Sequence, residues 1–363
     1  MRTQDDALSA IDRAVRVPSG ARRRPKLDGD NVTLAHGAGG KATAALIDAV
    51  FVEAFGTPNG PQLADAATLP VDGARIAFTT DSYVVNPIRF EGGSIGDLAV
   101  NGTVNDLAVC GAVPKWLSAA FIITEGTTFD SLRGIAADMR AAADKAGVAI
   151  VTGDTKVIPR AGDNQVFITT AGVGVVPEER ALGAVRVIPG DKVVLSGPIA
   201  AHGMAVMIAR GNLAFSAPIA SDTAAVNGLV EAVYGAVPAD AVRWMRDATR
   251  GGLGTVTNEL AADTDLGVLL DDEAIPVDPM VRGACDMLGI DPLHVANEGC
   301  FVAVLASDQV DAAVAAMRDA GATQACVIGA ITSDLPGVVA IRNGFGGTRL
   351  VDMLVGDPLP RIC

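Results

Sequence analysis

Short apolar runs alternate with segments of helical periodicity along most of the chain, and this alternation predicts an α/β (α+β) protein. Turns rich in Gly, Pro and Asp separate the two kinds of segment. We predict strands at residues 73–81, 116–124, 148–151, 166–176, 192–196, 243–247, 300–306 and 325–331. We predict helices from residue 42, at 94–110, 130–146, 200–210 and 221–236, after 251 as far as 262, and at 309–320.

The helix predicted at residues 94–110 carries an unusual polar face. Asp97, Asn101 and Asn105 recur every four residues, so they project from one side of the helix. No Lys or Arg occurs between residues 90 and 114, although the solvent-facing side of a helix ordinarily carries charges. Carboxylates and amides suit Mg²⁺ and the phosphates that it binds. A buried polar face that bonds to neighbouring loops is the alternative interpretation, and the sequence leaves both open.

Acidic residues stand beside several predicted strands. Asp81 and Asp247 end strands, and Asp154 follows one. A hairpin that joins Asp65 to the first of these strands brings Asp65 near Asp81. This repetition indicates that several strands present acidic residues to one site.

Two glycine-rich segments are candidates for anion binding. The first, His36-Gly37-Ala38-Gly39-Gly40-Lys41, leads into a helix, and the second, around Gly251, follows Asp247. Glycine permits close backbone approach, and the N-terminus of a helix favours negative charge. The first segment lacks the GxxxxGK spacing of a P-loop. A flexible loop without a binding role is an equally good interpretation of it.

Composition excludes several classes of protein. The chain has 363 residues, 50% of them hydrophobic, and a formal charge of −14, so we expect no nucleic-acid partner. No apolar run approaches the roughly 20 residues that span a bilayer, and no signal peptide is recognisable, so we expect a cytoplasmic protein without a membrane partner. The five cysteines form no CxxC pair, which argues against a disulfide framework or a zinc site.

We divide the chain into four parts. Residues 1–30 are polar and locally basic, and we expect a flexible extension. Residues 31–178 and 186–340 form two predicted domains, and residues 341–363 form a predicted mobile tail. The tail ends in Cys363, whose thiol can travel into a site; a cysteine there by chance is the alternative. A prenylation signal is excluded, because it needs the cysteine four residues from the end.

Five motifs, in this order, resemble those of the PurM-like superfamily of ATP-using enzymes, which includes aminoimidazole ribonucleotide synthetase and thiamine-monophosphate kinase. They are Asp65-Ala66-Ala67, Thr79-Thr80-Asp81, residues 105–111, Gly153-Asp154 and residues 247–253. Within the superfamily, the chain is most similar to the HypE family of nickel–iron hydrogenase maturation factors. That similarity rests on residues 36–40, 153–157 and 296–299 and on the closing Pro360-Arg361-Ile362-Cys363.

The resemblance implies a PurM-like two-domain fold whose N-terminal domain forms a β-barrel with a second copy in a homodimer. It implies that the chain is an ATP-dependent carbamoyl dehydratase using Mg²⁺. A HypF-type carbamoyltransferase would load a carbamoyl group onto Cys363, and the resulting thiocarboxamide would be dehydrated to a thiocyanate. The cyanide would then pass to a HypC–HypD iron scaffold.

Carried over to this chain, that chemistry suggests roles for single residues. The expected metal ligands are Asp65, Asp81, Asp106 and Asp247. The residues expected to bind ATP are Asp81, Asn101, Asn105, Asp154, His36, Lys41 and Gly251. Cys363 would carry the reacting group, and Lys156 and Glu298 would remove its amide protons. A phosphate contact by Lys156 and a structural role for Glu298 remain open.

Two other functions also remain open. A sibling kinase or synthetase would act on a free small molecule and have no use for Cys363. A carrier protein would bind nucleotide only as a regulatory ligand. The acidic residues beside the strands argue against the carrier, and the terminal cysteine argues against the enzyme with a free substrate.

Overall fold

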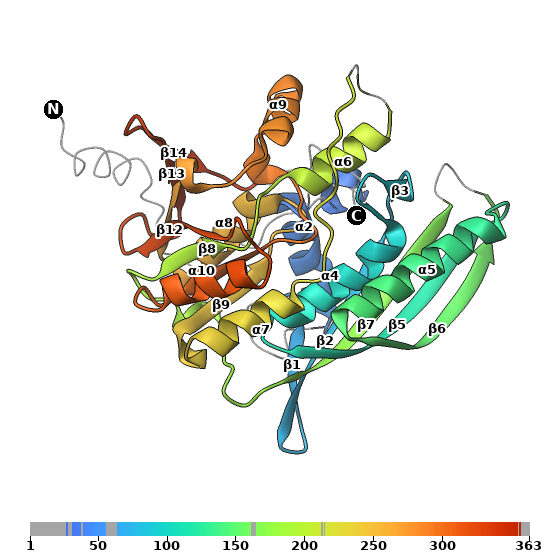
Figure 1. Ribbon diagram of the computed structural model, residues 1–363, viewed down its shortest axis with the longest axis horizontal. Coiled ribbons are helices and arrows are strands. Elements are labelled where there is room, and N and C mark those ends of the chain that lie inside the picture. Colours follow the sequence, from blue (N-terminus) through green and yellow to red (C-terminus); the bar gives the residue numbers. More distant parts are fainter. Residues whose placement is uncertain are drawn as a thin grey trace.

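The computed structural model describes residues 27, 31–37, 39–55, 64–160, 165–211, 213, 215–354 and 356. They form two α/β halves, each built on one large sheet, with the first half on the right and the second on the left of Figure 1. The predicted α/β class is therefore confirmed. No helix in this described part of the chain is long and apolar enough to cross a membrane.

The sheet of the first half has five strands in the order β1-β2-β7-β5-β6. β5 and β6 run parallel, joined by a crossover helix, and the other neighbours run antiparallel. The strands are β1 (Ala67–Val71), β2 (Ala74–Tyr83), β5 (Val113–Thr124), β6 (Ala149–Ile158) and β7 (Val166–Val176).

Two helices, α4 (Ile95–Val109) and α5 (Phe129–Ala146), cover one face of this sheet (Figure 1). α4 begins at Ser94, whose Oγ accepts hydrogen bonds from the first backbone amides of the helix. α5 ends at Gly147, which adopts the left-handed conformation with a φ of 72°. Because α5 lies outside α4 and the second half packs against it, α4 is buried on nearly all sides.

The other face of the sheet is exposed over much of its area. The strand register places Phe78, Val173 and Trp116 in one row across β2, β7 and β5, and Ile122 lies further along β5 on the same face. Phe78, Trp116 and Ile122 are 43%, 52% and 42% exposed. We call this surface the open face. A single copy of the chain leaves these three large apolar side chains exposed.

The second half is built on a seven-stranded sheet in the order β14-β13-β10-β12-β8-β11-β9. The strand β11, between β8 and β9, is buried throughout, as expected for a continuous apolar run. The strands are β8 (Lys192–Leu195), β9 (Val242–Asp247), β10 (Gly267–Asp271), β11 (Phe301–Leu305), β12 (Cys326–Thr332), β13 (Val339–Arg342) and β14 (Thr348–Val351). The helices are α6 (Ala201–Ala209), α7 (Asn227–Ala236), α8 (Gly252–Thr264), α9 (Pro279–Leu288) and α10 (Val310–Asp319).

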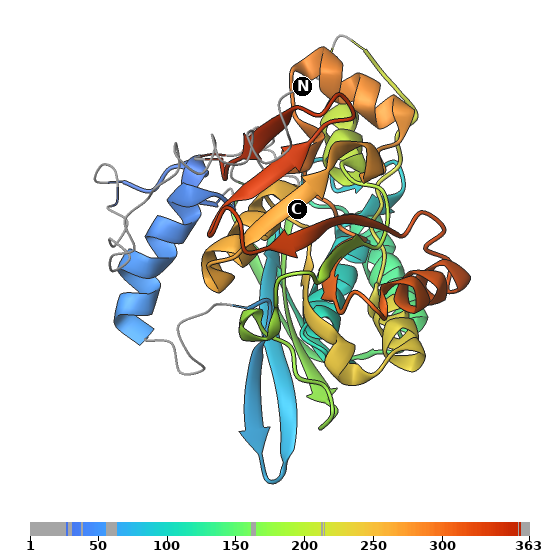
Figure 2. The same cartoon turned by 90° about the vertical axis from the view of Figure 1, so that its left-hand side faces the viewer.

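The remaining elements are short. Figure 2 shows the helical segment of residues 41–55 at one side of the molecule, while the β1–β2 hairpin projects from the body. The segment comprises α2 (Lys41–Leu46), the π-helix η2 (Ile47–Val52) and α3 (Glu53–Phe55). The others are the hairpin strands β3 (Arg89–Phe90) and β4 (Gly93–Ser94) and the 3₁₀ turns η1 (Leu34–Gly37), η3 (Ala184–Arg186), η4 (Ala239–Ala241), η5 (Asp272–Ala274) and η6 (Pro292–His294).

Most predicted elements are confirmed with bounds that differ by up to three residues, and three larger differences occur. β6 does not stop before Gly153 and Asp154: it pairs with β5 as far as Ile158, so Asp154 lies within a strand. Glycine fits there because a Cβ at residue 153 would lie 2.2 Å from the Ala119 carbonyl oxygen. Part of the tail predicted from residue 341 is instead a strand, because β14 pairs with β13 and Val351 is buried.

The third difference lies before α7. The helix predicted at residues 221–236 begins only at Asn227, and the residues before it form no helix. The side chain of Asn105 in α4 donates a hydrogen bond to the Ala224 carbonyl and accepts one from the Val226 amide. Tertiary contacts therefore replace the helical bonds that periodicity predicts here.

Candidate active site

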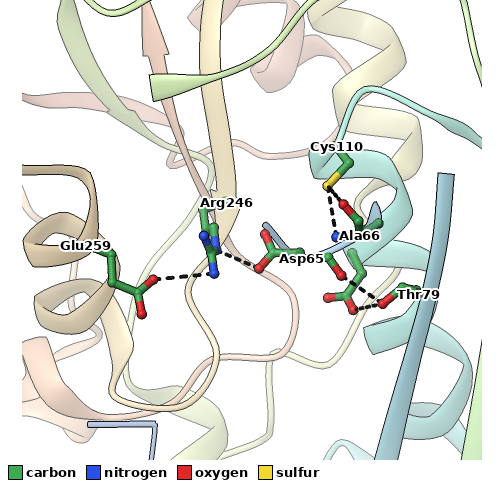
Figure 3. Close-up of polar contacts among 7 residues, drawn as sticks. Asp65, Ala66, Thr79, Cys110, Arg246 and Glu259 are labelled. Carbon is green, nitrogen blue, oxygen red and sulfur yellow. Dashed lines mark hydrogen bonds and ion pairs between the residues drawn. The ribbon is translucent and has the colours of Figure 1, made fainter. Parts of the chain in front are cut away.

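Three carboxylates from distant parts of the chain meet between the two halves. Asp65, Asp106 and Asp247 each offer one oxygen, and these oxygens lie within 4.8 Å of one another. Asp65 precedes β1, Asp106 lies on α4 and Asp247 ends β9. Thr79 on β2 connects the first two, since its Oγ1 lies 2.8 Å from the Asp65 carbonyl oxygen and 2.7 Å from Oδ2 of Asp106 (Figure 3).

Burial and like charge act together on this group. Burial is the largest cause that raises the pKa of Asp65, Asp106 and Asp247 above the ordinary carboxylate value. The charge of Asp81 raises the pKa of all three further. Carboxylates crowded in this way are poorly solvated and repel one another, so a cation between them is strongly favoured.

Arg246 supplies part of the missing positive charge. Its Nε lies 2.6 Å from Oδ1 of Asp65, and its Nη2 lies 3.4 Å from an oxygen of Glu259 (Figure 3). The second oxygen of Asp65, Oδ2, is buried and has no hydrogen-bond partner among the described residues. An oxygen in that state is suited to bind a cation, and an all-carboxylate set suits a hard one such as Mg²⁺. The residues present therefore fit a metal.

A small cavity adjoins this group: Asp106 and Asp247 line it, together with other residues of both halves. Asp81 borders it and accepts a hydrogen bond of 3.1 Å from the Tyr83 hydroxyl. Tyr83 fits because Gly102 has no side chain: a Cβ there would overlap the Tyr83 hydroxyl. The charged and polar residues lining the cavity include Asp81, Asp106, Asp247, Thr249, Arg250 and Glu298.

Glu298 is the buried acid on the side of the second half, with 3% of its surface exposed. Burial raises the pKa of Glu298 well above its ordinary value, and the charges of Asp247, Asp222 and Asp81 raise it further. The charge of Arg250 lowers it. A carboxylate with a raised pKa is a stronger base near neutral pH, which suits proton transfer.

Asn101 and Asn105 do not project toward solvent or an open cleft. The Asn101 amide donates to Thr223 Oγ1 at 3.2 Å, and Asn105 bonds to Ala224 and Val226. Both side chains are buried. The alternative interpretation of the polar face of α4, a buried face bonded to a neighbouring loop, is correct for these two amides. Their predicted contact with ATP stays a prediction.

Asp154 and Lys156 lie away from the acidic group in a single copy. They form an exposed ion pair of 3.2 Å on the edge strand β6. In the strand register, Asp154 stands in one row with Ser82, which is next to Asp81 in β2 and therefore points to the other side of the sheet. Lys156 pairs with Ile122 of the open face. Both residues of the ion pair therefore lie on the open face, opposite to Asp81. β6 is three strands from β2, about 14 Å at about 4.8 Å per strand. The prediction that Asp154 joins the other acidic residues is therefore wrong within one copy.

The two glycine-rich segments lie side by side. Arg250 donates a hydrogen bond of 3.1 Å to the Gly37 carbonyl, and a Cβ at Gly39 would lie 2.8 Å from the Arg250 Cβ. Gly251 precedes α8 with a φ of 78°. Residues 36–41, the first segment predicted to bind an anion, are thus close to the residues that line the cavity.

The remaining predicted residues have other contacts. His36 Nδ1 accepts a hydrogen bond of 3.0 Å from the Thr33 amide, and Lys41 pairs with Asp352 at 2.8 Å. Cys363 lies outside the described residues.

Sequence reasoning missed Arg246, Glu259 and Asp222. Arg246 directly precedes Asp247 on a largely buried strand, and a cation in such a strand was an available signal. Asp222 lies in the segment that was predicted as helix, so its contacts were not accessible from periodicity.

Comparisons with known proteins identify the family. Residues 63–176 match the N-terminal domain of the AIR synthase related proteins, and residues 189–341 match their C-terminal domain. A carbamoyl dehydratase HypE from Rhodobacter capsulatus is 50% identical over 341 residues, which cover 92% of this chain and 98% of the relative.

Solved structures agree with the sequence matches. The chain resembles HypE in a crystal structure of a HypE–HypF complex with a TM-score of 0.80, 41% identity and coverage of 85% of this chain and 100% of the other. It resembles HypE in complex with ATP with a TM-score of 0.76, 40% identity and coverage of 92% and 100%. The family expected from the sequence motifs is confirmed, as is the PurM-like two-domain fold. The chain belongs to the HypE family of the AIR synthase related proteins.

Proposed function

We propose that this chain is an ATP-dependent carbamoyl dehydratase that converts a thiocarboxamide on its own Cys363 to a thiocyanate. The observation that carries the proposal is the buried group of Asp65, Asp106 and Asp247 beside the cavity that Glu298 lines. In the reaction the amide C–O bond breaks, the oxygen leaves with the γ-phosphoryl group of ATP, and nitrogen loses both protons as the C≡N bond forms. The products are the thiocyanate, ADP and phosphate.

The metal would be Mg²⁺, held by Asp65, Asp106 and Asp247 with Asp81 at the border of the group. The support is the unpartnered Oδ2 of Asp65 and the raised pKa values of the carboxylates. When bound, Mg²⁺ supplies positive charge to the phosphoryl group in transit. The protein's own contribution is to fix the ligands, with Arg246 holding Asp65 and Thr79 holding Asp106.

Glu298 would accept a proton from the amide nitrogen. It lines the cavity with Asp81, Asp106 and Asp247, and its burial excludes water that would compete for the proton. Arg250, whose charge lowers the pKa of Glu298, would keep a fraction of the carboxyl groups ionised.

Lys156 would act in the site of a second copy. It lies on the open face, where the exposed side chains of Phe78, Trp116 and Ile122 would pair two copies. Joining two open faces would place the edge strand β6 of one copy along the opposite edge of the partner's sheet, beside β1 and β2. Because Asp81 points to the other side of β2, Lys156 would enter the partner's site around this edge. We propose a homodimer in which each site combines Glu298 of one copy with Lys156 of its partner.

The proposed partners follow the chemistry of the tail. A relative forms a HypE–HypF complex in its crystal structure, which supports a HypF-type carbamoyltransferase as the donor to Cys363. A HypC–HypD iron scaffold would receive the cyanide. A relative has also been solved with ATP, which supports the nucleotide. The cytoplasmic location stays a prediction.

Intact mass spectrometry tests this function. The wild-type protein should gain the mass of one carbamoyl group when incubated with the donor enzyme. It should then lose the mass of one water only when MgATP is added. Cys363→Ala should show neither change. If the wild type hydrolyses ATP while its mass never changes, a kinase or synthetase acting on a free substrate is the better assignment.

A further inference from the structure

A segment without helix or strand, residues 219–226, which we call the strap, crosses between the two halves beside the site. At one end the Ser221 amide donates a hydrogen bond of 2.8 Å to the Glu91 carbonyl of the β3–β4 hairpin. Further along, Asn101 and Asn105 of α4 bond to the strap. At the other end the strap continues into α7. It is thus fixed to the first half along its length.

The strap holds both peptide groups of Glu298. The Glu298 amide lies 3.2 Å from each carboxylate oxygen of Asp222, and the next amide, that of Gly299, donates to Asp222 Oδ2 at 3.0 Å. The Glu298 carbonyl accepts hydrogen bonds from the Ala224 amide at 3.2 Å and from the Asn105 amide group at 3.3 Å. Donor and acceptor of the Glu298 backbone are therefore both satisfied by the strap and α4.

Close packing strengthens this arrangement. A Cβ on Gly299 would lie 1.9 Å from the Asp222 carbonyl oxygen, so any side chain at residue 299 would push the strap away from Glu298. The sequence after Glu298 is thus adapted to the strap, and the contact is not an incidental surface bond.

We infer that Asp222 is a positioning residue, which fixes the backbone of Glu298 and so aims its carboxylate into the cavity shared with Asp81, Asp106 and Asp247. The inference rests on the proposed function, in which Glu298 accepts a proton from the amide. The Asp222 oxygens are occupied by the amides of residues 298 and 299, so Asp222 acts through Glu298 and not as a base itself. Proton transfer needs hydrogen-bond reach, and a displacement of about 1 Å lowers a rate by about 100-fold.

The consequence is a coupling between the halves. Glu298 belongs to the second half, whereas the strap that positions it is held by α4 and the β3–β4 hairpin of the first half. Asp106, on the same helix α4, belongs to the proposed metal group. One helix therefore aligns the proposed base and the proposed metal ligand with each other.

The test uses the full chain, carbamoylated on Cys363 by the donor enzyme and then mixed with MgATP in a single turnover. Asp222→Asn keeps the size of the side chain but replaces one of its two acceptor oxygens with an NH₂ group. One backbone amide that now donates to Asp222 would then face a second donor. Gly299→Ala disturbs the same contact from the other side. We expect both to slow dehydration by about 10–100-fold while the half-saturating MgATP concentration changes by less than about threefold.

Asp278→Asn is the matched control. Asp278 also accepts a hydrogen bond from a backbone amide, that of Met280 at 2.8 Å, but it caps α9 and is not among the residues that line the cavity. It should turn over at the wild-type rate. Carbamoyl loading of Cys363 should be the same in all these variants, because loading does not use Glu298.

A double mutant separates positioning from a general structural role. If Asp222 acts through Glu298, Asp222→Asn combined with Glu298→Gln should be no slower than Glu298→Gln alone. Additive losses, a weakened affinity for MgATP, or an unchanged rate in Asp222→Asn would each overturn the inference. Failure of the proposed function would look different, since the wild type itself would then not lose water.

Discussion

Arg246 and Asp65 share one ion pair, and it uses only half of the carboxylate: Nε of Arg246 lies 2.6 Å from Oδ1, while Oδ2 is buried without a hydrogen-bond partner in the described part of the chain. The arginine thus holds the carboxylate in place and leaves one oxygen for a ligand. Because Arg246 is the positive charge in direct contact with Asp65, it also offsets the repulsion in the acidic group before a metal binds.

Arg246→Met should therefore destabilise the metal-free protein. Removing one partner of a buried ion pair leaves an uncompensated charge, so we expect a loss of about 3–5 kcal/mol in the free energy of unfolding. Urea unfolding in EDTA measures it. Adding Mg²⁺ should stabilise this variant more than the wild type, because the cation replaces the missing charge.

Glu259→Gln is the control for this variant. Glu259 contacts the same arginine at a longer distance and its side chain is 36% exposed, so its removal should change stability by less than about 1 kcal/mol. Equal losses in the two variants would show that the role assigned to the Arg246–Asp65 pair is wrong.

The acidic group predicts a pH dependence of stability. The pKa values of Asp106 and Asp247 are raised in the folded protein. Between the unfolded value near 4 and the raised value, the folded state binds more protons than the unfolded state. This contribution to stability is present at low pH and is lost as the pH rises through that window.

The metal-free wild type should accordingly lose more stability between pH 5 and pH 8 than Asp247→Asn, which lacks one of the titrating groups. Urea unfolding in EDTA at several pH values gives both slopes. With Mg²⁺ present the two slopes should approach each other, because a bound cation favours the ionised carboxylates. A steeper fall in the Asn variant would contradict the assignment.

The sequence was sufficient to predict the fold class. It also predicted correctly that three of the four acidic residues beside predicted strands lie near one another. Asp65 and Asp81 are joined by a short hairpin, and Asp247 ends a strand, so local pattern places them. Asp154 was misplaced because Gly153 and Asp154 look like the end of a strand, while pairing with β5 continues through them.

The contacts of Asn101, Asn105 and Asp222 were beyond local pattern. Helical spacing showed correctly that the two amides share a face, but not what covers that face. The strap that covers them comes from more than 110 residues later in the chain, and the separation from Asn105 to Ala224 alone is 119 residues. Helical periodicity predicted a helix for those strap residues. The tertiary hydrogen bonds that override this local preference cannot be recognised in a local sequence pattern.

Asn105→Asp should weaken the contact between the halves. The Asn105 amide group donates to the carbonyls of Ala224 and Glu298, and a carboxylate there would face two acceptors without a proton to give. Each buried group left unsatisfied costs about 1–3 kcal/mol, so we expect a loss of about 2–4 kcal/mol in the free energy of unfolding.

Asn227→Asp is a matched change, since the Asn227 amide group donates to one carbonyl instead of two, that of Ala146 at 2.9 Å, and the residue is only half-buried. It should cost less than half as much. Urea unfolding measures both losses. If they are equal, the two hydrogen bonds that the Asn105 amide group donates stabilise the protein no more than the single bond from Asn227.

The open face and Lys156 lead to the last prediction. If each site combines Glu298 of one copy with Lys156 of its partner, Lys156→Ala and Glu298→Gln should each be nearly inactive alone. A mixture of the two, allowed to exchange subunits, forms mixed dimers with one intact site. It should regain about a quarter of wild-type activity, since half the dimers are mixed and half of their sites are intact.

Trp116→Lys supplies the control for that experiment. It places a charge in the middle of the open face, so sedimentation should show a monomer, and the same two variants carrying it should not complement each other. Phe129→Lys, at a side chain 77% exposed on α5 across the sheet from the open face, should remain dimeric and permit complementation. Without any recovery in the mixed sample, Lys156 would have to act in its own copy, against its position on β6.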